Sequence, residues 1–153
     1  MCRRGEGPRS HYGVIMHSKP RVVIIEDDAI LAFLFREVCR AAGWTVCGDA
    51  STIDHARSLL LDHSPDLVLL DYSLGKGDGI ELLKDIRNAW PQTYVTLVTG
   101  WDIEALMARI DFIDPDCILT KPLAPAALTA HLDARRSDLV QLQSALIQIA
   151  YAA

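Results

Sequence analysis

The residues best suited to chemistry in this sequence are Glu26, Asp27, Asp71, Thr99 and Lys121, and each lies at the end of a short apolar run. Carboxylates that gather at one place repel one another, and their pKa values rise unless a cation lies among them. Mg²⁺ prefers carboxylate oxygens and keeps several waters when it binds. A lysine and a hydroxyl suit a phosphoryl group, and an aspartate can form an aspartyl phosphate. These side chains therefore predict magnesium-assisted phosphoryl transfer to Asp71.

Buried strands must position these side chains. Continuous apolar runs are typical of strands covered on both faces of a parallel sheet, and they lie at 21–25, 44–50, 66–70, 93–99 and 117–120. Helical patterns follow them, at about 30–43, 52–62, 80–90 and 102–110 and from residue 125 onward. This alternation predicts an α/β fold, a (βα)5 doubly wound parallel sheet with strand order 2-1-3-4-5. Such sheets bind ligands beyond the carboxyl ends of their strands, where the reactive residues fall.

The first predicted helix carries more apolar residues than one buried face needs. Asp28 directly precedes this helix and is a candidate N-cap. The helical period predicts that the face against the sheet consists of Ile30, Phe33, Leu34 and Val38. Leu31 and Phe35 are then left either for the surface, where a partner could bind, or for packing against the last helix.

Four sequence stretches each span the end of a predicted strand, and they follow one another along the chain as VVIIEDD, DLVLLDYSLGKGDGIELL, VTLVTG and LTKPL. Together they resemble the response-regulator receiver domain of two-component signalling, over about residues 20–136. The resemblance implies a flavodoxin-like receiver fold and a phosphoryl group passed to Asp71 from a sensor histidine kinase or a histidine phosphotransfer protein. It also implies that Mg²⁺ is the cofactor. Phosphorylation would shift the population of the domain towards an active form, and partner proteins would bind that form.

The resemblance assigns the metal site residue by residue. Asp71 matches the aspartate that accepts the phosphoryl group. Glu26 and Asp27 match the acidic pair, with Asp27 the direct ligand of Mg²⁺ and Glu26 acting through water. Ser73 matches the residue whose backbone carbonyl binds the metal.

The resemblance also assigns the residues that respond to phosphorylation. Thr99 matches the switch hydroxyl, Lys121 matches the lysine that contacts the phosphoryl group, and Pro122 matches a cis proline. Ile118 stands where the family commonly has tyrosine or phenylalanine. Trp101 resembles the aromatic residue of the Thr-Gly-aromatic (FAT GUY) subgroup, so it either replaces the missing ring and shields the phosphoryl group from water or merely packs on the neighbouring helix.

The turn after Asp71 departs from the family, because SLGKGDG replaces the usual Leu-Pro sequence. Gly75 and Gly77 are expected to make this turn more mobile than one that contains proline. Lys76 is expected to point into solvent.

Composition excludes several other classes of protein. The net charge of −5 and the lack of a basic patch argue against a nucleic-acid binder. No apolar run reaches the roughly 18 to 20 residues that a membrane span needs. The four cysteines form no CxxC motif, which favours free thiols in the cytoplasm over zinc. Residues 1–19 are basic and rich in glycine and proline, and we expect a disordered leader in which Met16 could be the true start.

The C-terminal segment has a heptad repeat. Its positions are spaced alternately by four and three residues at Leu128, Leu132, Arg135, Leu139, Leu142, Leu146 and Ile149. This spacing predicts that the last helix continues through 137–153 and that 128–149 forms a homodimer interface. The alternatives are a segment that folds back over the domain or one that is disordered. We expect a single-domain response regulator that signals through protein contacts.

Other functions remain open at this level. The protein could drain phosphate from a branched relay, or it could be an unphosphorylated pseudo-receiver scaffold, which the isoleucine at position 118 keeps open. A phosphohydrolase with an aspartate nucleophile would need a second aspartate at position 73, where Ser73 stands. A flavodoxin would need a phosphate-binding loop in place of EDDAILA. We therefore expect no enzyme activity beyond slow self-dephosphorylation.

Overall fold

The computed structural model describes residues 19–75, 77–110 and 113–152. Almost all of the predicted leader, including Met16, lies outside the described residues, as does Lys76. The elements are β1 Arg21–Ile25, α1 Ala29–Ala41, β2 Thr45–Ala50, α2 Ile53–His63, β3 Leu67–Asp71, β4 Ser73–Leu74, β5 Gly77–Asp78, α3 Gly79–Ala89, β6 Tyr94–Thr99, α4 Ile103–Ile110, β7 Cys117–Thr120 and α5 Pro125–Ala152.

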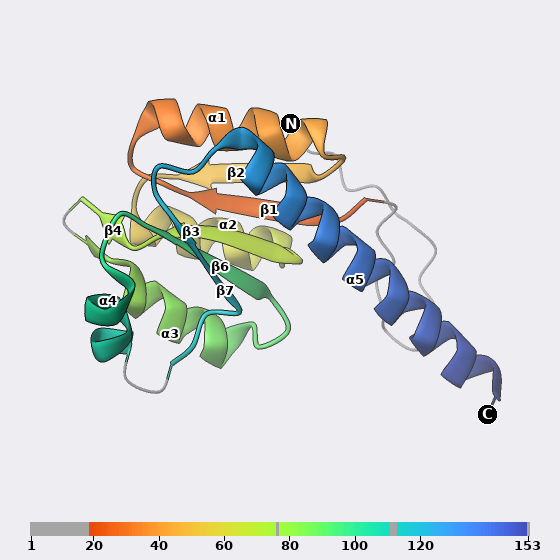
Figure 1. Cartoon of the computed structure of the whole chain (residues 1–153). Helices are drawn as coiled ribbons and strands as arrows, with labels where there is room; N and C mark the ends of the chain where they lie inside the picture. Colours follow the sequence, from red (N-terminus) through yellow and green to blue (C-terminus); the bar gives the residue numbers. More distant parts are fainter. Residues whose placement is uncertain (1–18, 76, 111–112, 153) are drawn as a thin grey trace.

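Five parallel strands form one sheet in the order β2-β1-β3-β6-β7 (Figure 1). Because β6 and β7 are the fourth and fifth of these strands along the chain, the predicted order 2-1-3-4-5 and the (βα)5 fold are confirmed. One apolar cluster joins the sheet to α2, α3 and α4, and a second joins it to α1 and α5. The layers are therefore helices, sheet and helices, as a doubly wound fold requires.

The central strands explain why the apolar runs are continuous. Along β1, Val23 and Ile25 belong to the cluster with α2 and α3, whereas Val22 and Ile24 belong to the cluster with α1 and α5. Side chains of a strand alternate between its two faces, so a strand covered on both faces must be apolar at every position. Burying each such side chain fully contributes about 1.5 to 3 kcal/mol to folding.

Aspartate side chains cap the helices that follow β1 and β5. Asp28 Oδ1 accepts the backbone N–H of Ile30 at 2.8 Å and of Leu31 at 3.0 Å, so the predicted cap of α1 is confirmed. Asp78 caps α3 in the same way, because its Oδ1 accepts the N–H of Ile80 at 2.9 Å. These caps satisfy N–H groups that have no acceptor within the helix.

The prediction for the buried face of α1 was wrong. Ile30 and Phe33 are 79% and 56% exposed, and the buried side chains are Ala32, Phe35 and Cys39. These three are spaced by three and four residues and therefore lie on one face of the helix. The buried face of α1 therefore includes two small side chains, Ala32 and Cys39, whereas two of its large apolar residues face solvent.

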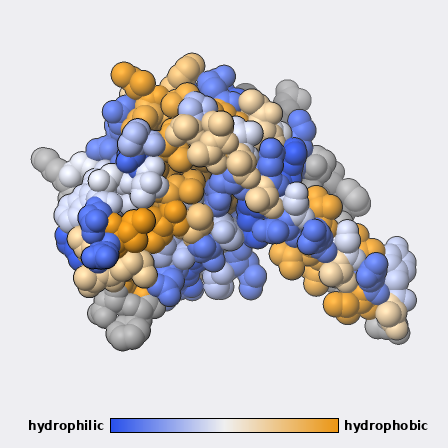
Figure 2. Space-filling view, viewed as in Figure 1, coloured by the Kyte–Doolittle hydropathy of each residue, from blue (hydrophilic) through white to orange (hydrophobic). Residues whose placement is uncertain are grey.

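Helix α5 is continuous over 28 residues, as the heptad repeat predicts. Its first turns are anchored by Leu128 and Leu132, which are buried beneath it. The remainder extends beyond the edge of the sheet (Figure 1), and hydrophobic residues run along this projecting end (Figure 2). Over the described ranges, no helix is both long enough and apolar enough to cross a membrane.

Candidate functional site

Three carboxylates meet at the carboxyl edge of the sheet. Glu26 and Asp27 directly follow β1, and Asp71 is the last residue of the neighbouring strand β3. One oxygen from each lies within 4.8 Å of the others. Glu26 and Asp71 are buried, whereas Asp27 is exposed. Parallel strands end at the same edge, so residues 44 or more positions apart converge as the sequence predicts.

Lys121 is the cation that the structure places among these carboxylates. Its Nζ donates to Glu26 Oε2 at 2.8 Å and to Asp71 Oδ2 at 3.0 Å. Burial alone would lower the pKa of Lys121, but the hydrogen bonds to Glu26 and Asp71 outweigh it and raise that pKa. The ammonium group is therefore charged and oriented toward the carboxylates.

One lysine does not neutralise three carboxylates. Burial raises the pKa of Glu26, and the charge of Asp71 raises it further, against the lowering effect of the hydrogen bonds from Lys121 and from the backbone N–H of Asp28. The donors are hard carboxylate oxygens with excess negative charge, which is the environment that Mg²⁺ prefers. The residues at the site therefore fit a magnesium ion.

The turn after Asp71 wraps around the site. Strands β4 and β5 pair Ser73 with Asp78, and the Ser73 N–H donates to Asp71 Oδ1 at 3.1 Å. A Cβ on Gly75, whose φ is +52°, would lie 3.3 Å from Asp27 Oδ2. This backbone therefore approaches the acidic pair closely, and it brings Ser73 beside Asp71.

Gly79 has a structural role that the sequence analysis missed. A Cβ at this position would lie 2.6 Å from the carbonyl oxygen of Asp71 and 2.9 Å from that of Tyr72. Real Cβ atoms do not approach backbone so closely, so the start of α3 can pack under Asp71 only with glycine here. The sequence signal is weak, because glycine at the first position of a helix has no strong meaning alone.

Thr99 ends β6 and is fully buried. Its Oγ1 accepts the backbone N–H of Trp101 at 2.9 Å, and its carbonyl accepts the N–H of Lys121 at 2.7 Å. Thr99 and Lys121 thus lie side by side at the ends of adjacent strands.

Two other predicted switch residues lie on or after β7. The peptide bond between Lys121 and Pro122 is cis. Ile118 lies on β7 and is partly buried against the cluster with α3 and α4, so an aliphatic side chain fills this place.

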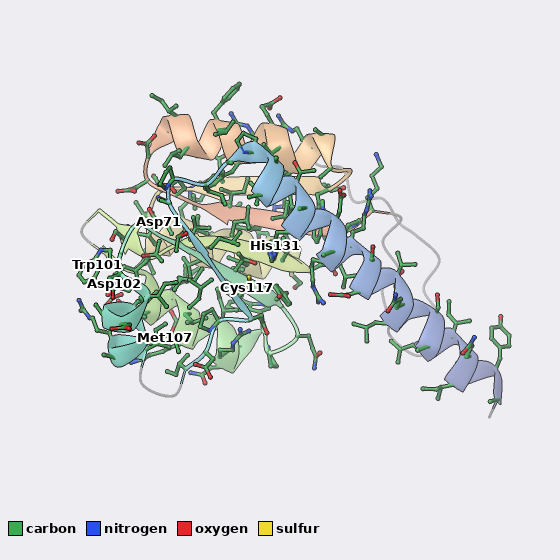
Figure 3. The ribbon with its side chains drawn as sticks, in the orientation of Figure 1. Asp71, Trp101, Asp102, Met107, Cys117 and His131 are labelled. Atoms are coloured by element: carbon green, nitrogen blue, oxygen red, sulfur yellow. The ribbon has the colours of Figure 1, made fainter. Side chains whose placement is uncertain are left out.

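A second polar group lies toward α5, and the sequence analysis assigned its histidine and cysteine no role. His131 Nε2 lies 2.7 Å from Thr96 Oγ1, and His131 Nδ1 lies 3.9 Å from Cys117 Sγ. Burial lowers the pKa of His131, and the charge of Arg135 lowers it further. Figure 3 shows this group apart from Asp71 and Trp101, so it is a polar junction between α5 and the sheet.

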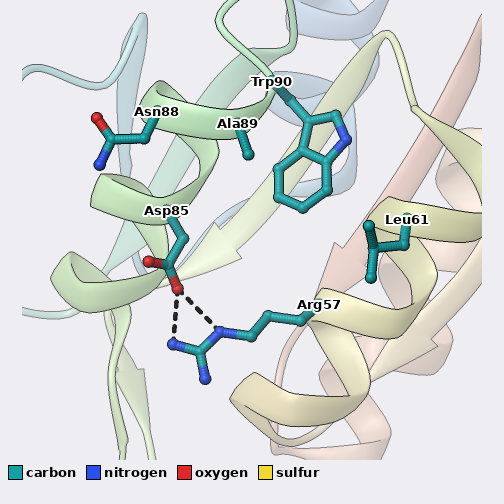
Figure 4. A pocket seen from close by; sticks show the side chains of 6 residues that line it. All are labelled: Arg57, Leu61, Asp85, Asn88, Ala89 and Trp90. Carbon is teal, nitrogen blue, oxygen red and sulfur yellow. Dashed lines mark hydrogen bonds and ion pairs between the residues drawn. The ribbon is translucent and has the colours of Figure 1, made fainter.

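A shallow hollow of about 320 Å³ lies between α2 and α3 (Figure 4). Its walls include Leu61 and Trp90, and its polar feature is Arg57, which donates to Asp85 at 2.6 and 2.9 Å. Hydrogen bonds to Asp85 and Glu81 raise the pKa of Arg57, so this guanidinium is already paired. None of the residues at the carboxyl edge lines this hollow.

The chain is similar in sequence to several known proteins. The sequence profile of the family described as "Response regulator receiver domain" matches residues 22–133. The chain is 35% identical over 113 residues to "Transcriptional regulatory protein PdtaR" of Mycobacterium tuberculosis, which covers 74% of this chain and 55% of that protein. It is 37% identical over 82 residues to "Transcriptional regulatory protein DcuR" of Escherichia coli, which covers 52% of this chain and 34% of that protein.

Solved structures and a shorter relative extend the comparison. The REC domain of AraT, a response regulator from Geobacillus stearothermophilus, has a TM-score of 0.72 at 27% identity and covers 81% of this chain and 98% of that domain. "Chemotaxis protein CheY" of Thermotoga maritima is 22% identical over 113 residues, which are 74% of this chain and 94% of that protein. The chain spans about a third to a little over half of the two transcriptional regulators.

Proposed function

The chain belongs to the family of response-regulator receiver domains, and from this premise we propose that Asp71 accepts a phosphoryl group. The donor in this proposal is a phosphohistidine of a sensor histidine kinase or a histidine phosphotransfer protein. The observation that carries the proposal is Lys121, whose ammonium group bonds both Glu26 and Asp71 at a buried edge. A lysine held on a buried carboxylate beside a strand-end hydroxyl is the arrangement that phosphoryl transfer to aspartate requires.

In the transfer step, one oxygen of Asp71 forms a bond to phosphorus while the bond from phosphorus to the donor imidazole nitrogen breaks. That nitrogen keeps the electron pair. Ser73 N–H and Lys121 Nζ already bind the two carboxylate oxygens, so they fix the orientation of the nucleophile. Lys121 and the hydroxyl of Thr99 then bind the phosphoryl oxygens.

Receiver domains bind Mg²⁺ in general, and we propose that Asp27, Asp71 and the carbonyl of Ser73 hold it here, with Glu26 acting through water. When bound, the ion supplies positive charge that offsets the charge of the transferring phosphoryl group. The excess of carboxylates over lysine supports this assignment, because Lys121 alone leaves the site negative.

The site of modification can be tested by chemical trapping. Hydroxylamine attacks the carbonyl carbon of an acyl phosphate, releases phosphate and leaves a hydroxamate on the carboxylate. After incubation with Mg²⁺ and acetyl phosphate, peptide mass spectrometry is expected to find the hydroxamate on Asp71, and a sample without acetyl phosphate is the control. A hydroxamate on another carboxylate would contradict the assignment to Asp71, and a hydroxamate on none would favour an unphosphorylated scaffold.

The exposed face of α1 supports a docking role. Ile30 and Phe33 lie on the surface of α1, which begins two residues after Asp27. An apolar face beside the site suits the helix that carries a phosphohistidine, because contact there places the donor near Asp71. We propose that the phosphodonor protein binds this face in the cytoplasm.

The output in this proposal passes through protein contacts, as a single-domain response regulator or as a phosphate sink. Leu128 and Leu132, the first two positions of the predicted 128–149 seam, are buried in the domain's own core, so a homodimer can use only the later part of that seam. Leu142, Leu146 and Ile149 are exposed there, and a homodimer would cover them. A chain that ends at Ser137 is expected to be monomeric in analytical ultracentrifugation, whereas the full chain is expected to dimerise. If both are monomers, the homodimer is wrong and the apolar side of α5 belongs to another contact.

A further inference from the structure

Three side chains from separate elements form a stack beside the site. Tyr72 directly follows Asp71, Trp101 lies two residues beyond Thr99, and Arg109 comes from α4. The rings of Tyr72 and Trp101 meet edge to face with centroids 5.1 Å apart. The Arg109 guanidinium lies 5.4 Å from the Trp101 ring and 6.0 Å from the Tyr72 ring. Figure 3 shows Asp71 and Trp101 at the same end of the sheet.

The contacts of Arg109 are with rings rather than with acids. Within residues 19–75, 77–110 and 113–152, Arg109 forms no ion pair, whereas Arg36, Arg40, Arg57, Arg87, Arg135 and Arg136 each do. A guanidinium near the face of an indole is attracted by the negative charge of that face. The position of Arg109 is therefore coupled to the position of Trp101.

The contacts with Tyr72 and Arg109 restrain the partly exposed side chain of Trp101. Tyr72 is buried and fixed by the core, whereas Trp101 is 44% exposed. Trp101 is attached to the switch residue through its own backbone, because its N–H donates to Thr99 Oγ1 at 2.9 Å. Arg109 on one element and Tyr72 on another thus restrain the segment that carries the hydroxyl beside Asp71.

We propose that Arg109 is a positioning residue that holds Trp101 at the rim of the Asp71 site and so prolongs the lifetime of the phosphorylated aspartate. This inference rests on the proposed phosphorylation of Asp71. Loss of phosphate is a hydrolysis in which a water oxygen bonds to phosphorus, the bond from phosphorus to Asp71 breaks, and a proton of the water leaves with inorganic phosphate. A ring held at the rim restricts the approach of that water.

The first measurement is the rate at which phosphate is lost. The full-length protein is phosphorylated with acetyl phosphate and Mg²⁺, the donor is removed, and intact mass follows the decay. Arg109→Met is expected to shorten the half-life about twofold to fivefold, and Arg109→Lys to restore it in part because the charge remains. Arg40→Met, which removes an exposed arginine from α1, is the control and is expected to decay as the wild type does.

A double variant tests whether Arg109 acts through Trp101. In a Trp101→Phe background, Arg109→Met is expected to change the half-life less than it does in the wild type, because the indole it positions is gone. An equal change in both backgrounds would overturn the proposal, since Arg109 would then act on the site directly.

A third measurement does not depend on phosphorylation. Quenching of tryptophan fluorescence by acrylamide, with the Trp101→Phe protein as the reference that lacks this indole, is expected to rise in Arg109→Met. If the wild type takes up no phosphate, the proposed function fails, while quenching still reports whether Arg109 holds Trp101. If the wild type is phosphorylated but Arg109→Met leaves both quenching and half-life unchanged, the positioning role is wrong and the proposed function stands.

Discussion

The two ends of this molecule depart from ordinary burial in opposite directions. At the carboxyl edge of the sheet, Glu26 and Asp71 are acidic yet only 3% and 5% exposed. At the far end of α5, Leu142, Leu146 and Ile149 are apolar yet 54%, 52% and 67% exposed. Burying carboxylates and exposing apolar side chains both cost free energy, so binding of a ligand or partner at either end would recover part of that cost.

The difference between the ends shows what kind of binding each needs. The carboxyl edge is small and negative, and Lys121 already offsets part of its charge. It therefore suits a small cation and a phosphoryl group. The end of α5 has no charged side chain after Asp138, and Leu139, Leu142, Leu146 and Ile149 follow a heptad repeat. It therefore suits another helix with the same pattern.

The largest expected effect is at the α5 end. The double variant Leu142→Glu, Leu146→Glu would place charges inside the proposed dimer, which is expected to weaken dimerisation by about 4 kcal/mol, or about a thousandfold. Sedimentation over a range of concentrations measures this change. The matched control is Gln141→Glu, Gln148→Glu, which adds the same charge at exposed positions outside the heptad seam. Equal dissociation constants for the two double variants would show that the seam is not the interface.

The next effect tests how tightly the carboxyl edge is packed. Gly79→Ala would force a Cβ against the backbone of Asp71 and Tyr72, and it is expected to lower the free energy of unfolding by about 2 kcal/mol. Gly100→Ala is the control, because its nearest contact would be Lys121 Cβ at an ordinary 4.0 Å. Urea denaturation of both variants gives the values. Similar stabilities would mean that the backbone under Asp71 adjusts and that the edge can accommodate a Cβ at position 79.

A smaller effect is expected from the aromatic rim. Trp101→Ala removes the indole that the stack holds beside Thr99, and it is expected to speed the loss of phosphate about tenfold, which is about 1.4 kcal/mol in the barrier. The half-life is followed by intact mass, with Trp90→Phe as a control from the far end of α3. An unchanged half-life would leave Trp101 as a packing residue with no kinetic role.

The smallest effect is a pH dependence at the carboxyl edge. The pKa of Glu26 is raised in the folded protein, so without Mg²⁺ the fold binds this proton more tightly than the unfolded chain does. Stability from this group is present below its ordinary pKa and is lost as pH rises through the raised value. The loss is expected to be small, because the hydrogen bonds from Lys121 and from the Asp28 N–H oppose the effect of burial on this pKa. Denaturation in EDTA measures it, and Glu26→Gln is expected to remove the slope, whereas a slope of equal size in that variant would assign it elsewhere.

Much of the site can be predicted from the sequence because it depends on which residues follow each apolar run. Apolar runs predict β1, β3, β6 and β7, and a parallel sheet brings the residues after each run to one edge. Glu26, Asp27, Asp71, Thr99 and Lys121 therefore meet as their positions predict. The turn and the α1 face depend instead on three-dimensional fit.

The missed features share that dependence. Nothing in the sequence signals that Gly79 must pass under the carbonyl of Asp71, since the contact joins the start of α3 to the strand before it. Arg109 is likewise separated from Tyr72 and Trp101 along the chain, and no pattern in the sequence indicates that α4 brings it to their rings. Ala32 and Cys39 were overlooked because small side chains carry little hydrophobic signal, although both are buried.

The most direct test of the account is the intact mass of the protein after incubation with Mg²⁺ and acetyl phosphate. The wild type is expected to gain the mass of one phosphoryl group, and to gain none when EDTA replaces Mg²⁺. Asp71→Asn, which keeps the shape of the side chain but loses the nucleophilic oxygen, is expected to gain none under either condition. Phosphorylation of both proteins, or of neither, would contradict the claim that the buried carboxylate at the end of β3 is the phosphoryl acceptor.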